Sequence, residues 1–333
     1  MKRIKILISL LIITAIFTGG KNNNTVETPS GTKTDSKDIV VLYTNDVHCA
    51  FYGDIGYDGL SAYKKKLESE SNHVFLVDNG DAVSGHLLDK LADGRSIVHL
   101  MNKTGYDVAI PGNHEFDNGA QNYIDLTKLM EFPVICCNFY DLRTGRTVFE
   151  PYIIKKAGDK KIAFVGVITP YPTTGSRAYL FQDEDKQPAY SFRGGKKDDE
   201  IYEEVQSAVN AANTKGADYT VLLSHLGINK NHSKYTSKDV IEHTDGIDAV
   251  LDAHSHSIVE MELVKNKNGE NVILSQTGSR LKNIGKLTIG SDGKMKTELI
   301  GEFTEKDPDV TKTIDNIRTL TKEKYRNSIL TTD

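Results

Sequence analysis

Short aliphatic runs alternate with amphipathic stretches along the chain from residue 38 onward. The aliphatic runs end in polar or glycine-containing turns, which is typical of buried strands. We predict strands at Ile39–Tyr43, Val74–Val77, Asp107–Ile110, Ile162–Ile168, Tyr219–Leu223 and Ile247–Leu251. Helical spacing predicts helices at Leu60–Ser69, Ala120–Leu129, Asp199–Thr214 and Lys238–His243. Alternating elements of this kind predict an α/β fold built from layered sheets.

The pattern changes toward the C-terminus. Residues 258–304 contain strand and turn signals without a helical stretch, and we predict a closing set of antiparallel strands. Beyond Pro308, apolar residues recur at helical spacing over Val310–Tyr325. This helix is expected to serve as a terminal brace, or as a linker to a further domain.

The N-terminus has the features of an export signal. Met1–Lys5 is positively charged, and Ile6–Phe17 is aliphatic but shorter than the about 20 residues that span a bilayer. The segment resembles a lipoprotein signal, except that Gly20 stands where a lipidated cysteine is expected. We predict a signal peptide over 1–20, a disordered linker over 21–37, a catalytic domain over 38–305 and a C-terminal linker helix over 306–333. The mature chain would have no transmembrane helix and would be secreted, periplasmic or attached to the cell surface.

Composition narrows the classes of partner. The chain has 333 residues, 26% of them charged, with a net charge of −5, which argues against a nucleic-acid polymer as partner. Three cysteines are too few for a disulfide scaffold. Cys136 and Cys137 lie in the apolar run Pro133–Cys137, which we predict to be a buried strand.

Polar side chains follow five of the predicted strands. The segments are Thr44–His48, Asp78–Asp81, Gly112–Asp117, Ser224–Gly227 and Asp252–His256, and they hold five of the ten histidines. Each segment alone also suits a turn or a helix cap. Together, at the carboxyl ends of strands, they are expected to meet in one crevice. Imidazole, carboxylate and carboxamide ligands suit Zn²⁺, Mn²⁺ or Fe, with Mg²⁺ or Ca²⁺ as alternatives. The donors outnumber the ligands of one tetrahedral ion, so two ions sharing a carboxylate fit better.

The order of these segments resembles the calcineurin-like metallophosphoesterase superfamily. Thr44–His48, Gly112–Asp117 and Gln276–Ser279 more narrowly resemble the 5′-nucleotidase family, over residues 38–305. The resemblance implies a four-layer α/β/β/α sandwich. It also implies two groups of metal ligands: Asp46, His48, Asp81 and His256 for one ion, and Asp81, Asn113, His225 and His254 for the other, with Asp81 bridging.

The same resemblance implies the reaction. Asn113 and His114 would bind the phosphate, and His114 and Asp117 would form a catalytic dyad, while Asp78 and Glu115 would bind no metal. A hydroxide shared by the two ions would attack phosphorus in phosphomonoesters. Nucleoside 5′-monophosphates are the expected substrates, as in nucleotide catabolism. UDP-sugars and cyclic nucleotides are alternative substrates, and a non-catalytic surface protein is an alternative function.

Two features depart from the family pattern. Cys49 stands where the family usually has glycine, and its thiol either adds a ligand to the metal or simply packs. We expect this sequence to lack the family's C-terminal domain, whose paired aromatic residues stack the nucleobase. The chain is therefore also considered as the catalytic half of a split 5′-nucleotidase that needs a separately encoded nucleotide-binding domain.

Overall fold

The computed structural model describes residues 38–51, 53, 55–70, 73–84, 94–170, 175–195, 199–230 and 234–330, with backbone alone for 324–330. The predicted signal peptide and linker, residues 1–37, lie outside the described residues. None of the described helices has the length and apolar character needed to cross a bilayer.

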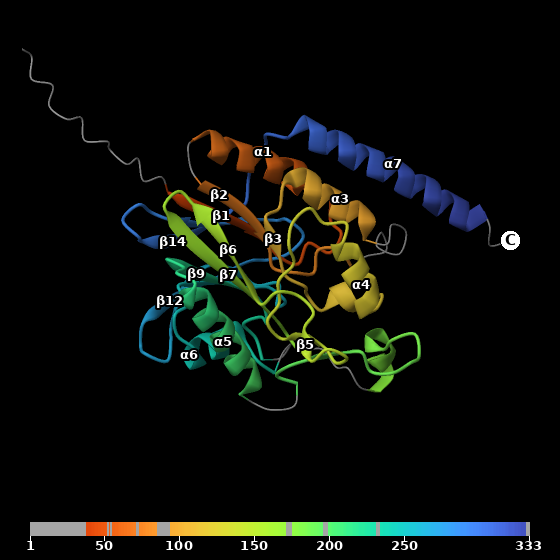
Figure 1. The fold of residues 1–333 in the computed structure, drawn as a ribbon. Helices are drawn as coiled ribbons and strands as arrows, with labels where there is room; N and C mark the ends of the chain where they lie inside the picture. The colour runs from red at the N-terminus through yellow and green to blue at the C-terminus, as the bar shows by residue number, and fades with distance from the viewer. Residues whose placement is uncertain are drawn as a thin grey trace, which may run out of the picture. The chain divides into compact units, whose positions relative to one another are not determined.

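Two mixed sheets form the centre of the structure (Figure 1). The first has the order β14-β13-β1-β2-β3, with bounds Met295–Ile300, Ile284–Ile289, Ile39–Thr44, His73–Asp78 and Val108–Ala109. The second has the order β11-β12-β10-β9-β7-β6, with bounds Ile258–Lys265, Asn271–Thr277, Ala249–Leu251, Tyr219–His225, Lys160–Ile168 and Tyr152–Ala157. The strands β1, β2 and β3 run parallel, as do β7, β9, β10 and β12.

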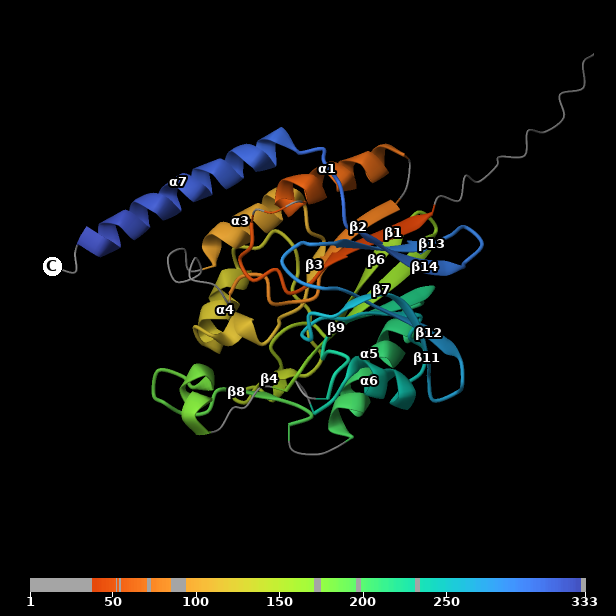
Figure 2. The same ribbon diagram turned by 180° about the vertical axis from the view of Figure 1, so that it is seen from behind.

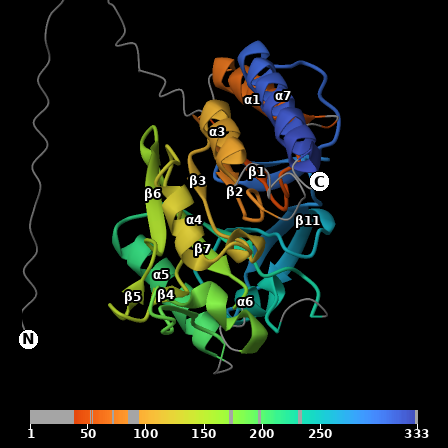
Figure 3. The same ribbon diagram turned by 90° about the vertical axis from the view of Figure 1, so that its right-hand side faces the viewer.

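Helices cover the outer face of each sheet (Figures 1 and 2). On the first sheet lie α1 (Gly56–Ser69), α3 (Arg95–Thr104) and α7 (Pro308–Leu330). On the second lie α5 (Glu200–Thr214) and α6 (Ser237–His243). The side view separates these layers, with the two sheets between the helices (Figure 3). The predicted four-layer α/β/β/α sandwich is confirmed.

Strand β1 shows why the central strands are continuously apolar. Val41 and Tyr43 pack between the two sheets, whereas Val40 and Leu42 pack under the helices. Because successive side chains of a strand point to opposite faces, a strand covered on both faces must be apolar at every position. All six residues of β1 are buried.

The structure contains two features that the sequence analysis did not predict, and it corrects one expectation. Helix α3 was not predicted, and neither was a third sheet of order β5-β4-β8, formed by Arg146–Thr147, Phe139–Asp141 and Tyr190–Phe192. The run Pro133–Cys137 is buried but makes only isolated bridges at Val134 and Ile135 instead of a strand. The antiparallel strands predicted over residues 258–304 are confirmed, with β11 and β12 paired in the second sheet and β13 and β14 paired in the first.

The C-terminal helix α7 packs on α1 and α3 through its apolar face. Val310, Ile314 and Ile317 are buried in the same core as these helices, and Leu320 is exposed. Asp307 precedes the helix and accepts hydrogen bonds from the backbone N–H of Asp309 (3.0 Å) and the hydroxyl of Ser61 on α1 (2.6 Å). The apolar face of α7 is therefore used within this domain.

Replacing Asp307 with alanine is expected to lower the free energy of unfolding by about 1 kcal/mol, because the helix loses its N-cap and its tie to Ser61. Burial raises the pKa of Asp307, but Lys65 and Ser61 outweigh it and lower the pKa from 3.8 to about 2. This stabilisation is therefore complete above pH 3.8 and is lost as the pH falls toward 2. Urea unfolding at pH 7 and pH 2 tests both statements, with exposed Asp309→Ala as control. A variant as stable as the wild type at pH 7 would refute the cap.

Candidate metal centre

The five predicted polar segments meet at the carboxyl ends of β1, β2, β3, β9 and β10. Each ligand candidate lies on the loop after its strand, except His225, which is the last residue of β9. The two sheets contribute to the same site, because His254 donates its backbone N–H to Asp46 Oδ2 (3.0 Å) across the sandwich. The convergence expected from parallel-strand topology is confirmed.

One group of potential ligands comprises Asp46, His48 and His256. One ligand atom from each lies within 4.8 Å of the others. His256 Nε2 is 3.4 Å from Asp46 Oδ1 and 3.0 Å from His48 Nε2. His48 Nε2 also lies 3.8 Å from Asp81 Oδ2.

A second group comprises Asp46, Asp81 and His225, and one ligand atom from each lies within 4.8 Å of the others. Asp81 Oδ2 is 3.3 Å from His225 Nε2, and Asn113 Oδ1 is also 3.3 Å from that nitrogen. The ring of His254 lies beside that of His225, with centroids 5.2 Å apart. Among the described residues His254 belongs to neither group, so its placement supports the predicted role less directly than that of the others.

The tautomer of His225 fits a cation at this position. Its Nδ1 donates to the carbonyl oxygen of Asn79 at 2.7 Å, which leaves the Nε2 lone pair facing the oxygens of Asp81 and Asn113. Metal-binding histidines are commonly oriented by such a bond from the other ring nitrogen. Three converging acceptors repel one another unless a proton or a metal ion lies between them. The residues present therefore suit a divalent metal ion.

Electrostatic effects in the site follow from burial and close charge pairs. Burial lowers the pKa of His225, but Asp81 overcomes it and raises the pKa to about 10. Burial raises the pKa of Asp81, while His225 and His48 lower it, and the net shift is downward. Burial also lowers the pKa of His48, and the pKa of His256 is raised by its bond to Asp46. The ligand candidates are thus coupled by charge.

Backbone strain is concentrated in the site. Nine non-glycine residues in the described part of the chain have positive φ, and six of them belong to the polar loops. These six are Asp46, His48, Cys49, Asp81, His254 and His256, with φ between 49° and 72°. Such conformations cost roughly 1 kcal/mol or more each and persist where the surroundings enforce them, often at functional sites. Five of the six are predicted metal ligands.

Cys49 also has a left-handed backbone conformation, with φ of 57°, which glycine adopts at no cost. Its side chain is buried in the hydrophobic core beneath α1 and belongs to neither group of ligand atoms. Of the two interpretations of Cys49, packing is the one supported. Cys136 and Cys137 are buried in cores on opposite sides, and burial raises the pKa of the Cys136 thiol to about 12.

The loops after β2 and β3 touch through two glycines. A Cβ atom added to Gly80 would lie 2.5 Å from the backbone nitrogen of Gly112. One added to Gly112 would lie 2.2 Å from Asp81 Oδ1 and 2.6 Å from His225 Cε1. Only residues without a side chain permit this approach.

Replacing Gly112 with alanine is therefore expected to displace Asp81 and His225, weaken metal binding and destabilise the fold by roughly 1–3 kcal/mol. Mn²⁺ titration together with thermal unfolding measures both effects. Gly195→Ala is a matched control, because its added Cβ would meet nothing closer than 3.6 Å. Normal Mn²⁺ binding by Gly112→Ala would contradict this packing.

The candidate dyad lies at the open side of the site. His114 Nδ1 is 2.8 Å from Asp117 Oδ2, and the side chain of His114 is 41% exposed. The hydrogen bond to Asp117 raises the pKa of His114 to about 9, against the effect of burial. Between them in sequence, Phe116 is fully buried and packs against Phe139 with ring centroids 5.0 Å apart. The aromatic core thus anchors the short 3-10 turn His114–Phe116 while leaving the dyad accessible.

Gln276 holds the loop that carries His254 and His256. Its side-chain amide donates to the carbonyl of Ala253 (2.9 Å) and to Asp252 Oδ2 (3.0 Å). Its oxygen accepts the backbone N–H of Ser257. The sequence contained Gln276 as part of a family motif, but its contacts on both sides of this loop could not be predicted.

Asp78 and Glu115 are fully occupied by other partners, in keeping with their predicted exclusion from the ligands. Asp78 accepts hydrogen bonds from the Thr44 hydroxyl (2.6 Å) and the Gly80 N–H (3.0 Å). Glu115 accepts four backbone N–H groups. Burial and Asp81 raise the pKa of Glu115 to about 7, against the effect of those bonds.

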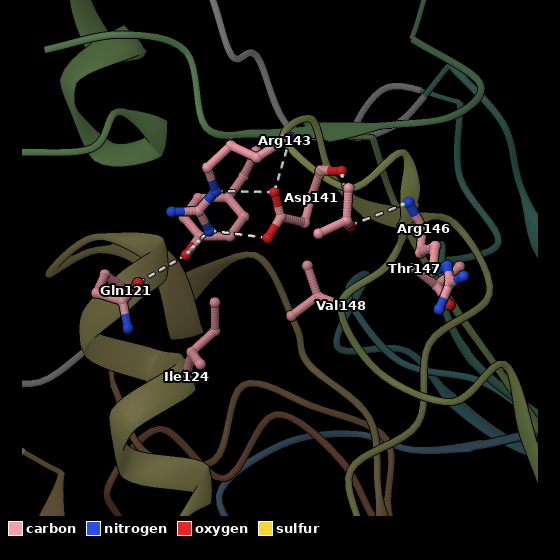
Figure 4. A pocket seen from close by; sticks show the side chains of 9 residues that line it. Gln121, Ile124, Asp141, Arg143, Arg146, Thr147 and Val148 are labelled. Carbon is pink, nitrogen blue, oxygen red and sulfur yellow. Dashed lines mark hydrogen bonds and ion pairs between the residues drawn. The ribbon is translucent and has the colours of Figure 1, made fainter. Parts of the chain in front are cut away.

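A separate pocket of about 680 Å³ lies between α4 (Ala120–Thr127) and the β4–β5 hairpin (Figure 4). Arg143 makes a two-point contact with Asp141 (2.9 and 2.8 Å), stacks over Tyr190 and donates to its hydroxyl. Tyr190 in turn donates to Gln121 on α4 (2.6 Å). The Arg143 guanidinium therefore links the hairpin to α4 through Tyr190. The residues that line the pocket include none of the predicted site residues.

Comparison with known proteins agrees with this geometry. A family model described as calcineurin-like phosphoesterase matches residues 39–257. Snake venom 5′-nucleotidase from Gloydius brevicauda is 28% identical over 242 residues, which cover 67% of this chain and 38% of that protein. Protein UshA of Escherichia coli (strain K12) is 34% identical over 160 residues, which cover 45% of this chain and 29% of UshA. The chain thus spans less than half the length of these relatives.

Solved structures share the fold. A 5′-nucleotidase precursor from Thermus thermophilus has a TM-score of 0.69 at 22% identity, covering 85% of this chain and 58% of that chain. The calcineurin-like phosphoesterase YfkN from Bacillus subtilis has a TM-score of 0.68 at 23% identity, covering 87% of this chain and 99% of that chain. At these identities the likeness concerns the fold.

Proposed function

The chain belongs to the calcineurin-like phosphoesterase family, whose members are metal-dependent phosphoesterases related to the 5′-nucleotidases, and we propose that it hydrolyses phosphomonoesters with two divalent ions. Nucleoside 5′-monophosphates are the proposed substrate class. The observation that carries the proposal is the placement of Asp81 Oδ2, between His48 Nε2 at 3.8 Å and His225 Nε2 at 3.3 Å. A carboxylate oxygen placed between two histidine ligands is suited to bridge two ions.

The two groups of ligand atoms share Asp46, whereas the proposed ligand sets share Asp81. One ion would be held by Asp46, His48, Asp81 and His256. The other would be held by Asp81, Asn113, His225 and His254. Imidazole with carboxylate and amide oxygens favours Zn²⁺, Mn²⁺ or Fe as the ions.

The residues around the ions would divide the remaining tasks. When bound, the ions would polarise the phosphoryl oxygens and activate a water molecule. Asn113 and His114 would contact the phosphate from the loop after β3. His114, oriented through Nδ1 by Asp117, would give its proton to the leaving alkoxide from Nε2.

A substrate panel with metal-loaded protein tests this function. AMP, a UDP-sugar, a 2′,3′-cyclic nucleotide and p-nitrophenyl phosphate are assayed with Mn²⁺ or Zn²⁺, before and after removal of the metal by a chelator. We expect phosphate release from AMP and p-nitrophenyl phosphate that is lost with chelator and restored by the metal. No hydrolysis of any substrate by protein shown to hold both ions would refute the enzymatic function of this chain.

The split-enzyme alternative is tested by the same assay. A chain that needs a separate nucleotide-binding domain would cleave p-nitrophenyl phosphate but not AMP until that domain is added. The buried apolar face of α7 gives no support to docking through that face, within the side chains described up to residue 323. The N-terminal sequence supports export of the protein, which secretion of a reporter fused to residues 1–37 would test.

A further inference from the structure

We propose that Glu115 is a positioning residue whose carboxylate ties together two of the loops that carry the proposed site residues and, through the loop after β2, a third. The inference rests on the proposed function, because those loops carry Asp46 and His48, Asp81, and Asn113 and His114. Glu115 is 5% exposed and belongs to neither group of ligand atoms. Glu115 would therefore influence the proposed metal site only through other residues.

Both oxygens of Glu115 are occupied by backbone donors. Oε2 accepts the N–H of Asp81 (2.7 Å) and the N–H of Gly112 (2.7 Å). Oε1 accepts the N–H of Ala82 (2.8 Å) and the N–H of Val83 (3.1 Å). One side chain thus ties the loop after β2 to the loop after β3.

The loop after β2 is also bound to the loop after β1, through its carbonyl groups. The carbonyl oxygens of Gly80, Asp81 and Ala82 accept N–H groups from Asp46, His48 and Cys49 at 3.0, 2.7 and 2.9 Å. The loop after β2 is therefore held from two sides, with the successive carbonyl groups of residues 80–82 on the loop after β1 and the successive N–H groups of residues 81–83 on Glu115. Successive backbone N–H groups that converge in this way form a concave site for an anion, here the carboxylate of Glu115.

This arrangement sets the direction of the Asp81 side chain. Asp81 has a left-handed conformation with φ of 59°, and its Oδ1 accepts the N–H of His114 at 2.8 Å. Oδ2 is left to face His48 and His225. If the bonds to Glu115 are lost, the strained loop after β2 is free to relax. Asp81 and Asn113 are then no longer held in fixed positions relative to each other. Partners that orient metal ligands typically affect metal affinity 10–100-fold when removed.

Glu115→Gln is the variant that tests this role. It keeps the side-chain volume but turns an amide NH₂ toward two backbone N–H donors, which breaks one of the two pairs of bonds. Glu115→Asp keeps both acceptor oxygens on a side chain shorter by one methylene, and therefore reaches fewer of the four donors. Glu204→Gln is the matched control, because Glu204 on α5 is half-buried and accepts the hydroxyl of Tyr140 away from the site.

Titration with Mn²⁺, followed by calorimetry and by the rise in melting temperature, measures the effect without turnover. We expect both Glu115 variants to bind Mn²⁺ at least 10-fold more weakly and to show a smaller metal-induced rise, while Glu204→Gln matches the wild type. At saturating Mn²⁺, kcat for p-nitrophenyl phosphate should fall more than KM changes. If Glu115→Gln fails to fold, Glu115→Asp decides by the same titration.

The outcomes separate the two proposals. Glu115 variants that are less stable but keep wild-type Mn²⁺ affinity and the full metal-induced rise would show a merely structural role and overturn this inference. Wild-type protein that binds no Mn²⁺ would overturn the proposed function itself, and the positioning role with it.

Discussion

Replacing His114 with alanine is expected to lower kcat 10²–10⁴-fold, the range in which a general acid typically contributes. His114 Nδ1 is bound to Asp117, its side chain is 41% exposed, and its ring centroid lies 5.2 Å from that of His48. The imidazole is thus placed at the mouth of the proposed metal centre. Neither group of ligand atoms includes it, so metal content should not change.

Steady-state assays with p-nitrophenyl phosphate and metal analysis of the same samples measure this prediction. His243→Ala is the matched control, because His243 lies on α6 and stacks on Tyr202 away from the site. A leaving group of low pKa needs less protonation, so the loss should be larger for AMP than for p-nitrophenyl phosphate. Full activity of His114→Ala on AMP would refute its assigned role.

Replacing Asp81 with asparagine is expected to have the largest effect on metal binding. The substitution keeps the shape of the side chain and an acceptor for the His114 N–H, but removes the negative charge facing His48 and His225. Because the proposed site uses this oxygen for both ions, affinity should fall for both. The loss should exceed the 10–100-fold typical of an outer partner, and turnover should fall in proportion.

Equilibrium dialysis against Mn²⁺ or Zn²⁺ gives the stoichiometry directly. We expect about two ions per wild-type chain and less than one per Asp81→Asn chain under the same conditions. Asp125→Asn on the exposed face of α4 is the control for loss of one charge. Retention of two ions by Asp81→Asn would exclude the bridging role, and loss of a single ion would restrict Asp81 to one position.

The large elements could be predicted because their sequence pattern is local. Strands such as β1 and β7 are apolar at successive positions, and α5 has helical spacing over its whole length. The third sheet could not be predicted, since its strands have two or three residues and β4 pairs with β8 about fifty residues away. Helix α3 carries Ile97, Val98, Leu100 and Met101 at helical spacing, a local pattern that is sufficient to predict a helix.

The meeting of the site residues at one place could be predicted, because strand ends and motif residues are visible in the sequence. Their conformations could not. The left-handed φ of Asp46 and Asp81 is imposed by contacts between loops, and the sequence around these two residues does not predict it. The same holds for Glu115, whose partners at residues 81–83 are more than thirty positions away.

The bond between His254 and Asp46 joins residues 208 positions apart in sequence. The chain must close that loop, insert β1 between β13 and β2, and bring the two sheets face to face before either ion finds a complete set of ligands. Contacts of such long range form slowly and late in folding. Metal uptake is therefore expected to be one of the last events of folding, and its rate would report when the whole sandwich has assembled.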